Sequence, residues 1–188
     1  MTPGCAAPLD VDTLLSYWAG DMSEREADVL EAHLFTCAAC AGRLGGIAAL
    51  GDGVATLTRR GRVSGIISPA IMNRLARDGV RVRLYSIAPG EAVPCAVWPT
   101  DDVLVVALRA DLAGITSVSL SIASADDQLI EQIDDVAVSS GDGAVLYASP
   151  GHLIRRMPSV RVRFTLVNNV EREHVLGAYV LEHSASQD

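Results

Sequence analysis

The chain has 188 residues, of which 49% are hydrophobic, 4% aromatic and 20% charged. This composition excludes a disordered tail, a collagen-like fibre and a disulfide-rich miniprotein. Fifteen basic residues against 23 acidic ones give a formal net charge of −8, which argues against nucleic acid as the direct partner. All the basic residues are arginine, so mechanisms that need a lysine amine are excluded as well.

The sequence favours a cytoplasmic protein without membrane attachment. No basic segment followed by an apolar one stands at the beginning, as a secretory signal requires. No run of about 18 apolar residues is present that could span a membrane. The four cysteines are too few for a disulfide scaffold, and two of them are three positions apart, which favours a metal or redox pair in a reducing compartment.

Residues 1–50 predict a small all-α domain. A first helix carries three apolar residues with helical spacing, Leu14, Leu15 and Trp18. A second helix begins at Ser23, which forms a capping box with Glu26 three residues later. A third helix follows Cys40, and four glycines between residues 45 and 53 predict a kink or a break in it.

Residues 51–79 predict a connector and an additional helix. Ser68 and Pro69 are typical of the cap and the first position of a helix, and Gly79 is a typical stop. The apolar face of this helix consists of Ile71, Met72, Leu75 and Ala76. Residues 51–83 carry seven arginines and two acidic residues, whereas residues 1–50 carry two arginines and seven acidic residues.

From residue 80 to residue 188 the apolar pattern changes from a helical period to a period of two. Eight β-like runs are separated by turn signals: 80–85, 93–98, 103–110, 115–123, 128–133, 144–148, 159–167 and 175–182. Residues 150–157 predict a short helix that crosses between two sheets. The expected fold is therefore multidomain α plus β, with a small all-α helical domain followed by an antiparallel β-sandwich.

The most specific signal is the motif His33-x-x-x-Cys37-x-x-Cys40. A histidine in the last turn of a helix and a cysteine four residues later project to one side, and Cys40 completes a thiolate pair there. Zinc favours such nitrogen and sulfur ligands in tetrahedral geometry. The fourth ligand must come from elsewhere, and Cys5 is the best candidate because it precedes the first helix of the same unit.

Two other interpretations of this motif are weaker. A Cys-x-x-Cys pair also occurs in thioredoxin-like redox sites, but no βαβ pattern surrounds it in this sequence. A lone histidine at a helix end often interacts only with the helix dipole. A unit of about 45 residues rarely has enough core of its own, and a structural zinc contributes roughly 10–16 kcal/mol in small peptides. Zn²⁺ is therefore the expected cofactor.

Residues 12–40 resemble the zinc-finger domain of zinc-binding anti-sigma factors. In that family a leucine-rich first helix leads through a glycine, an acidic and a hydrophobic residue to a Ser-x-x-Glu cap. An acidic helix that ends in His-x-x-x-Cys-x-x-Cys then follows. All these features are present, including Glu31 two residues before His33. The resemblance covers about the first 50 residues.

The resemblance implies a protein that sequesters an extracytoplasmic-function sigma factor and so represses transcription. In the family, a three-helix zinc unit and a separate fourth helix lie between the two sigma domains and cover their polymerase-binding faces. The corresponding partner-binding candidates are Leu14, Leu15 and Trp18 in the first helix and Ile71, Met72 and Leu75 in residues 69–78. The apolar face of residues 69–78 could equally pack on the β domain.

The chemistry of the cysteines leaves two roles open. Some members of this family release zinc and the sigma factor when the thiols are oxidised, whereas others keep an inert zinc site. Cys37, Cys40 and Cys5 fit either case, because one disulfide removes two ligands at once. We favour the structural role and keep the redox switch as a hypothesis.

The β domain is expected to be a sensory or interaction domain and not an enzyme. It lacks a nucleophile elbow, a phosphate loop and a dinucleotide fingerprint. Its histidines, His152, His174 and His183, are far apart in the sequence and are expected to be single surface residues. The competing interpretation of the whole chain is a zinc-stabilised adaptor or ligand-binding regulatory protein that does not act on a sigma factor.

Overall fold

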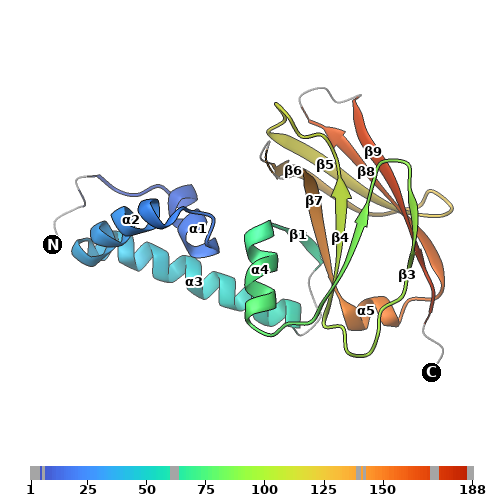
Figure 1. Cartoon of the computed structure of the whole chain (residues 1–188), viewed down its shortest axis with the longest axis horizontal. Coiled ribbons are helices and arrows are strands. Elements are labelled where there is room, and N and C mark those ends of the chain that lie inside the picture. Colours follow the sequence, from blue (N-terminus) through green and yellow to red (C-terminus); the bar gives the residue numbers. More distant parts are fainter. Residues whose placement is uncertain are drawn as a thin grey trace. The chain divides into compact units, whose positions relative to one another are not determined.

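The computed structural model describes residue 5 and residues 7–59, 64–138, 141, 143–169 and 174–185, without the side chains of residues 50–59 and 70. Two compact units share the chain, Met1–Arg60 and Gly61–Asp188 (Figure 1). The boundary predicted at residue 50 falls inside a helix that extends to Arg59. Residues 51–79, predicted as one connecting segment, are divided between the two units.

The first unit consists of three helices, α1 (Val11–Ala19), α2 (Glu24–Thr36) and α3 (Ala38–Arg59). Gly20 ends α1 in the left-handed conformation with φ of 82°, and the predicted capping box of Ser23 and Glu26 begins α2. Of the predicted kink or break in α3, the break is wrong, because the helix continues without interruption over 22 residues. Each interior glycine costs only about 1 kcal/mol relative to alanine, which tertiary packing can offset.

The interior of the first unit is small. The buried side chains that the structure describes there are Leu14, Ala19, Leu30 and Cys40. Two hydrogen bonds join separate segments around them: the Tyr17 hydroxyl donates to Oε1 of Glu31 at 2.8 Å, and the Arg43 guanidinium donates to the carbonyl of Leu9 at 3.4 Å. The buried apolar side chains among the described residues supply little hydrophobic stabilisation, and small units of this kind usually gain further stability from a metal or a partner.

The second unit contains nine strands in two sheets. They are β1 (Gly65–Ile67), β2 (Val82–Ile87), β3 (Ala92–Cys95), β4 (Val103–Arg109), β5 (Ser117–Ser124), β6 (Leu129–Ala137), β7 (Ala144–Pro150), β8 (Val160–Asn168) and β9 (Val175–His183). The strand orders are β1-β7-β4-β2 and β3-β9-β8-β5-β6. The eight predicted strands are confirmed. The sequence missed β1, which is three residues long and lies where a connector was predicted.

The prediction that all strands are antiparallel is wrong. Among the described residues β2 pairs with β4 in parallel, and β3 pairs with β9 in parallel, so both sheets are mixed. The other pairings are antiparallel. Parallel pairs need a crossover connection. Here the chain runs from β2 in one sheet to β3 in the other sheet and then returns to β4 in the first sheet. The predicted short helix is confirmed as α5 (Gly151–Arg155), which lies between β7 of one sheet and β8 of the other.

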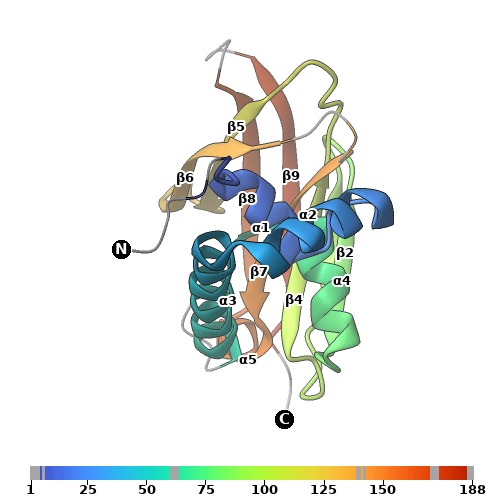
Figure 2. The same ribbon diagram turned by 90° about the vertical axis from the view of Figure 1, so that its left-hand side faces the viewer.

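One hydrophobic core lies between the two sheets. It includes alternate residues of β5 and β8, such as Leu120 and Phe164, together with Val106 and Leu108 of β4. A second cluster on the opposite face of β4 contains Val105, against which Met72 packs. Helix α4 (Pro69–Arg77), which carries Met72, therefore covers the outer face of this sheet (Figure 2).

The ends of α4 follow the prediction. The Ser68 hydroxyl accepts a hydrogen bond from the backbone N–H of Ile71, and Pro69 occupies the first turn. Gly79 follows with φ of 76°. None of the described helices is both long enough and apolar enough to cross a membrane.

Candidate metal centre

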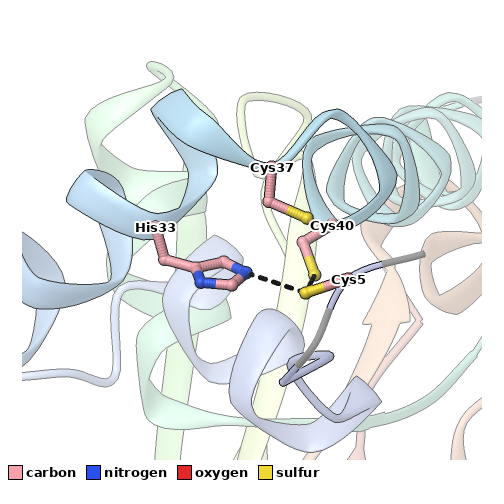
Figure 3. Close-up of side chains that lie close together, drawn as sticks. All are labelled: Cys5, His33, Cys37 and Cys40. Carbon is pink, nitrogen blue, oxygen red and sulfur yellow. Dashed lines mark hydrogen bonds between the residues drawn. The ribbon is translucent and has the colours of Figure 1, made fainter. Parts of the chain in front are cut away.

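Four side chains of the first unit converge on one point, Cys5, His33, Cys37 and Cys40 (Figure 3). Each offers one ligand atom, and all four atoms lie within 4.8 Å of one another. The Sγ atom of Cys5 is 3.6 Å from Nε2 of His33 and 4.0 Å from Sγ of Cys40. In the described parts of the chain, no second group of three or more such side chains is close enough to share a metal ion.

The junction between α2 and α3 positions three of the four ligands. His33 lies in the last turn of α2, and Cys37 is the cap residue, whose backbone N–H donates to the carbonyl of His33 at 2.9 Å. Cys40 lies in the first turn of α3 and is 1% exposed. The cap turns the chain sharply, so the thiols of Cys37 and Cys40 face the imidazole of His33.

The fourth ligand comes from the segment before α1. The carbonyl of Leu9 accepts a hydrogen bond from Arg43, which lies one turn beyond Cys40 on α3. This bond joins the segment that carries Cys5 to the helix that carries Cys40. The sequence gives no indication of this contact, because Leu9 and Arg43 are 34 positions apart.

The local electrostatics favour a thiolate at Cys37. The backbone N–H of Cys40, followed by the Cys5 thiol, donates a hydrogen bond toward its sulfur and lowers the pKa of Cys37 to about 6. The pKa of Cys5 is raised, chiefly because its thiol donates to Cys37. Thiolates are the form of cysteine that binds metals, so the cluster holds one sulfur ready as a ligand.

The residues fit a zinc ion. Three sulfurs and one imidazole nitrogen form a Cys₃His donor set, which is typical of closed structural zinc sites. With Zn–S of about 2.3 Å and Zn–N of about 2.0–2.1 Å, tetrahedral ligand atoms lie about 3.5–3.8 Å apart. The separations of 3.6 and 4.0 Å from Sγ of Cys5 are close to these values, and all four atoms lie within 4.8 Å of one another. If all four atoms bound one ion, its tetrahedral coordination would be complete.

The predicted partner-binding residues differ in their accessibility. Leu15 is 46% exposed and Trp18 is partly exposed, but Leu14 is 0% exposed. A partner contacts accessible side chains, so the correction is that Leu14 belongs to the interior of the unit. In α4, Met72 packs on the sheet, while Ile71 and Leu75 are partly buried.

Two exposed apolar side chains on the helix of His33 were not among the partner-binding residues predicted from the sequence. Phe35, in the last turn of α2, is 88% exposed, and Val29 of the same helix is 71% exposed. Their apolar character is visible in the sequence, but their exposure depends on which face of α2 packs against α3. The surface position expected for His183 is also wrong, because this residue is 5% exposed.

A match to a protein family covers the segment that holds three of the four clustered side chains. Residues 11–41 match a family described as a putative zinc finger. The match includes His33, Cys37 and Cys40, whereas Cys5 lies before it. No curated protein matches the chain. A solved structure, the N-terminal domain of phage TP901-1 ORF48, is 7% identical, with 57% of this chain and 99% of that chain covered and a TM-score of 0.35.

Proposed function

We propose that the protein is a zinc-binding anti-sigma factor, which sequesters an extracytoplasmic-function sigma factor in the cytoplasm and so represses transcription. The observation that carries the proposal is the convergence of Cys5 on His33, Cys37 and Cys40, which lie in a segment that matches a zinc-finger family. Zinc fingers of this kind occur in anti-sigma factors. The β-sandwich of the second unit would receive the signal.

The zinc site would act by holding a binding surface in shape. Cys5, His33, Cys37 and Cys40 would ligate the ion and so fix the segment before α1 and the ends of α2 and α3. Bound zinc supplies the folding free energy that the small core of this unit lacks. No catalytic step is involved.

An apolar face of α1 supports the proposed interaction. Val11, Leu15 and Trp18 recur at spacings of four and three residues, so they lie on one side of the helix. Val11 is 62% exposed, and Phe35 of α2 is more exposed still. Exposed apolar side chains on a segment with seven acidic residues and two arginines in residues 1–50 suit a partner with an apolar groove and a basic rim. An acidic surface would also keep this protein away from DNA.

The test is co-purification with the extracytoplasmic-function sigma factors of the same organism, each produced together with this protein. We expect one of them and the zinc-replete protein to form a stable complex that His33→Ala or Cys37→Ser abolishes. Cys95→Ser is the matched control, because Cys95 is buried in the second unit outside the cluster. A well-folded, zinc-loaded protein that leaves the sigma factor free would contradict the proposal and favour the adaptor or ligand-binding alternative.

A further inference from the structure

The second unit contains a cavity that the proposed sigma-binding role does not use. Its volume is about 360 Å³, and it lies between the sheets at the side where α5 connects them. Its wall is largely apolar and includes Leu104, Val106, Ile122, Val162, Phe164 and Leu181. The partly exposed side chains of Ile130 and Leu153 also line it. Ligand pockets typically have volumes of about 300–1,000 Å³ and mostly apolar linings.

A buried histidine lines this cavity without any polar partner. His183, in the last position of β9, is 5% exposed, and neither of its ring nitrogens has a hydrogen-bond partner among the described residues. Buried polar side chains are nearly always hydrogen-bonded, because leaving one unpaired costs the full desolvation of the group. An imidazole carries one donor and one acceptor when it is neutral. It therefore offers both functions to a molecule in the cavity.

Two further polar pairs line the same cavity. The Tyr147 hydroxyl donates to Oε2 of Glu131 at 2.6 Å, and the hydroxyls of Ser64 and Ser149 are 2.9 Å apart. Glu131 is the single charged residue among the described residues that line the cavity, and no arginine lines it. An anionic ligand would therefore meet a carboxylate with no compensating cation.

We propose that this cavity binds a small, largely apolar molecule with an uncharged hydroxyl-type polar group. The apolar wall takes the body of the molecule. The polar group hydrogen-bonds to His183 and reaches the Tyr147–Glu131 pair. That such binding is the signal for release of a sigma factor rests on the proposed function, but the binding itself does not.

The experiment measures binding to the full-length, zinc-loaded protein with N-phenyl-1-naphthylamine, an uncharged probe whose fluorescence rises in apolar sites. We expect the fluorescence of the probe to rise saturably as it binds. 1-Octanol should displace the bound probe at a concentration at least tenfold lower than octanoate does. Glu131→Gln should reduce this preference for the alcohol, because it removes the charge that repels octanoate and keeps the size of the side chain.

Removal of the polar groups provides a matched comparison. His183→Leu and Tyr147→Phe should each raise the concentration of 1-octanol needed for displacement by about 3- to 10-fold, the effect of one lost hydrogen bond. Tyr179→Phe is the control, because the Tyr179 hydroxyl donates to the carbonyl of Arg109 and does not line the cavity. His183→Leu should also raise the melting temperature of the ligand-free protein, because it removes an unpaired buried group.

The outcomes separate this proposal from the proposed function. If the probe does not bind, or if His183→Leu and Tyr147→Phe behave like Tyr179→Phe, the cavity holds only water and the inference is overturned. If circular dichroism shows that His183→Leu or Tyr147→Phe does not fold, Glu131→Gln takes its place. An unchanged preference of Glu131→Gln for 1-octanol over octanoate would then overturn the inference. Binding of a sigma factor is measured without octanol, so either result can fail while the other stands.

Discussion

The thiol of Cys5 lies 3.6 Å from the imidazole of His33, although 28 residues separate them in the chain. This contact joins the segment before α1 to the last turn of α2. It converts a local motif of three ligands into a group of four. A tetrahedral ion bound there would join the segment before α1, the end of α2 and the start of α3 through one point.

Cys5→Ser should weaken zinc binding strongly. Changes to groups that only orient the ligands of a metal typically cost about 10- to 100-fold in affinity, and loss of a direct ligand should cost at least as much. Competition with a chromophoric chelator measures the effect, and Cys95→Ser, outside the cluster, serves as the control. Equal zinc affinity of Cys5→Ser and the wild type would show that the fourth ligand is another group.

Removal of zinc should unfold the first unit and leave the second intact. Among its described residues the first unit buries few apolar side chains, whereas the second has an extensive core between its sheets. After chelation, hydrogen exchange should lose protection in α1 and α2 and retain it in β4 and β8. Restored zinc should restore protection. Persistent protection of α2 in the metal-free protein would mean that packing alone maintains this unit.

Phe35→Ser should weaken the complex with the sigma factor without destabilising the protein. Phe35 is 88% exposed, and substitutions at such sites usually change the free energy of unfolding by less than about 0.5 kcal/mol. Leu30→Ala on the same helix is the contrast, because Leu30 is buried and should cost about 2–5 kcal/mol. Thermal unfolding and pull-down of the sigma factor measure the two effects. Unchanged capture by Phe35→Ser would exclude this residue from the interface.

The stability of the second unit should fall in strong acid through Asp102. Its carboxylate accepts two hydrogen bonds from the Arg81 guanidinium, at 2.9 and 3.0 Å, and this contact lowers the pKa of Asp102 to about 2. A group whose pKa is lowered on folding stabilises the fold above its unfolded value, here 3.8, and this contribution disappears as the pH falls toward 2. Solvent screening at this exposed pair makes the effect modest.

Asp102→Asn should therefore flatten the pH dependence of the free energy of unfolding between about pH 4 and pH 2, relative to the wild type. Arg81→Met should flatten it to a similar extent, and the two changes should not be additive, because each removes the same pair. Denaturant unfolding at several pH values measures this. If Asp102→Asn alone is effective, the cause is the backbone N–H of Arg81, which also donates to this carboxylate.

Features that depend on residues close together in the chain can be predicted from the sequence, whereas features that depend on distant residues cannot. His33, Cys37 and Cys40 were predictable because the end of one helix and the start of the next place them together within eight residues. Cys5 was inferred from the need for a fourth ligand. The burial of His183 was not predictable, because it depends on the pairing of β9 with β3 and β8 and on the opposite sheet.

The errors in the predicted fold have similar physical causes. Strand patterns specify which residues face the core but not which strands become neighbours, so the parallel pairs β2–β4 and β3–β9 left no local signal. The continuity of α3 shows that the four glycines between residues 45 and 53 do not end this helix, because each costs only about 1 kcal/mol relative to alanine. For α4 the sequence left two roles open for Met72, and its packing against the sheet became visible only in the structure.

Gly177 of β9 should be among the least tolerant glycines of the second unit. A Cβ atom at this position would overlap the hydroxyl and ring carbons of Tyr179, a buried residue whose hydroxyl donates to the carbonyl of Arg109 at 2.7 Å. Gly177→Ala should therefore force this ring from its site and destabilise the protein by about 1–3 kcal/mol. Gly65→Ala in β1 is the control, because nothing lies within 4 Å of its Cβ position.

The cause is steric, so in a Tyr179→Ala background Gly177→Ala should lose most of its cost in denaturant unfolding. An equal cost in both backgrounds would place the strain in the backbone of β9 instead.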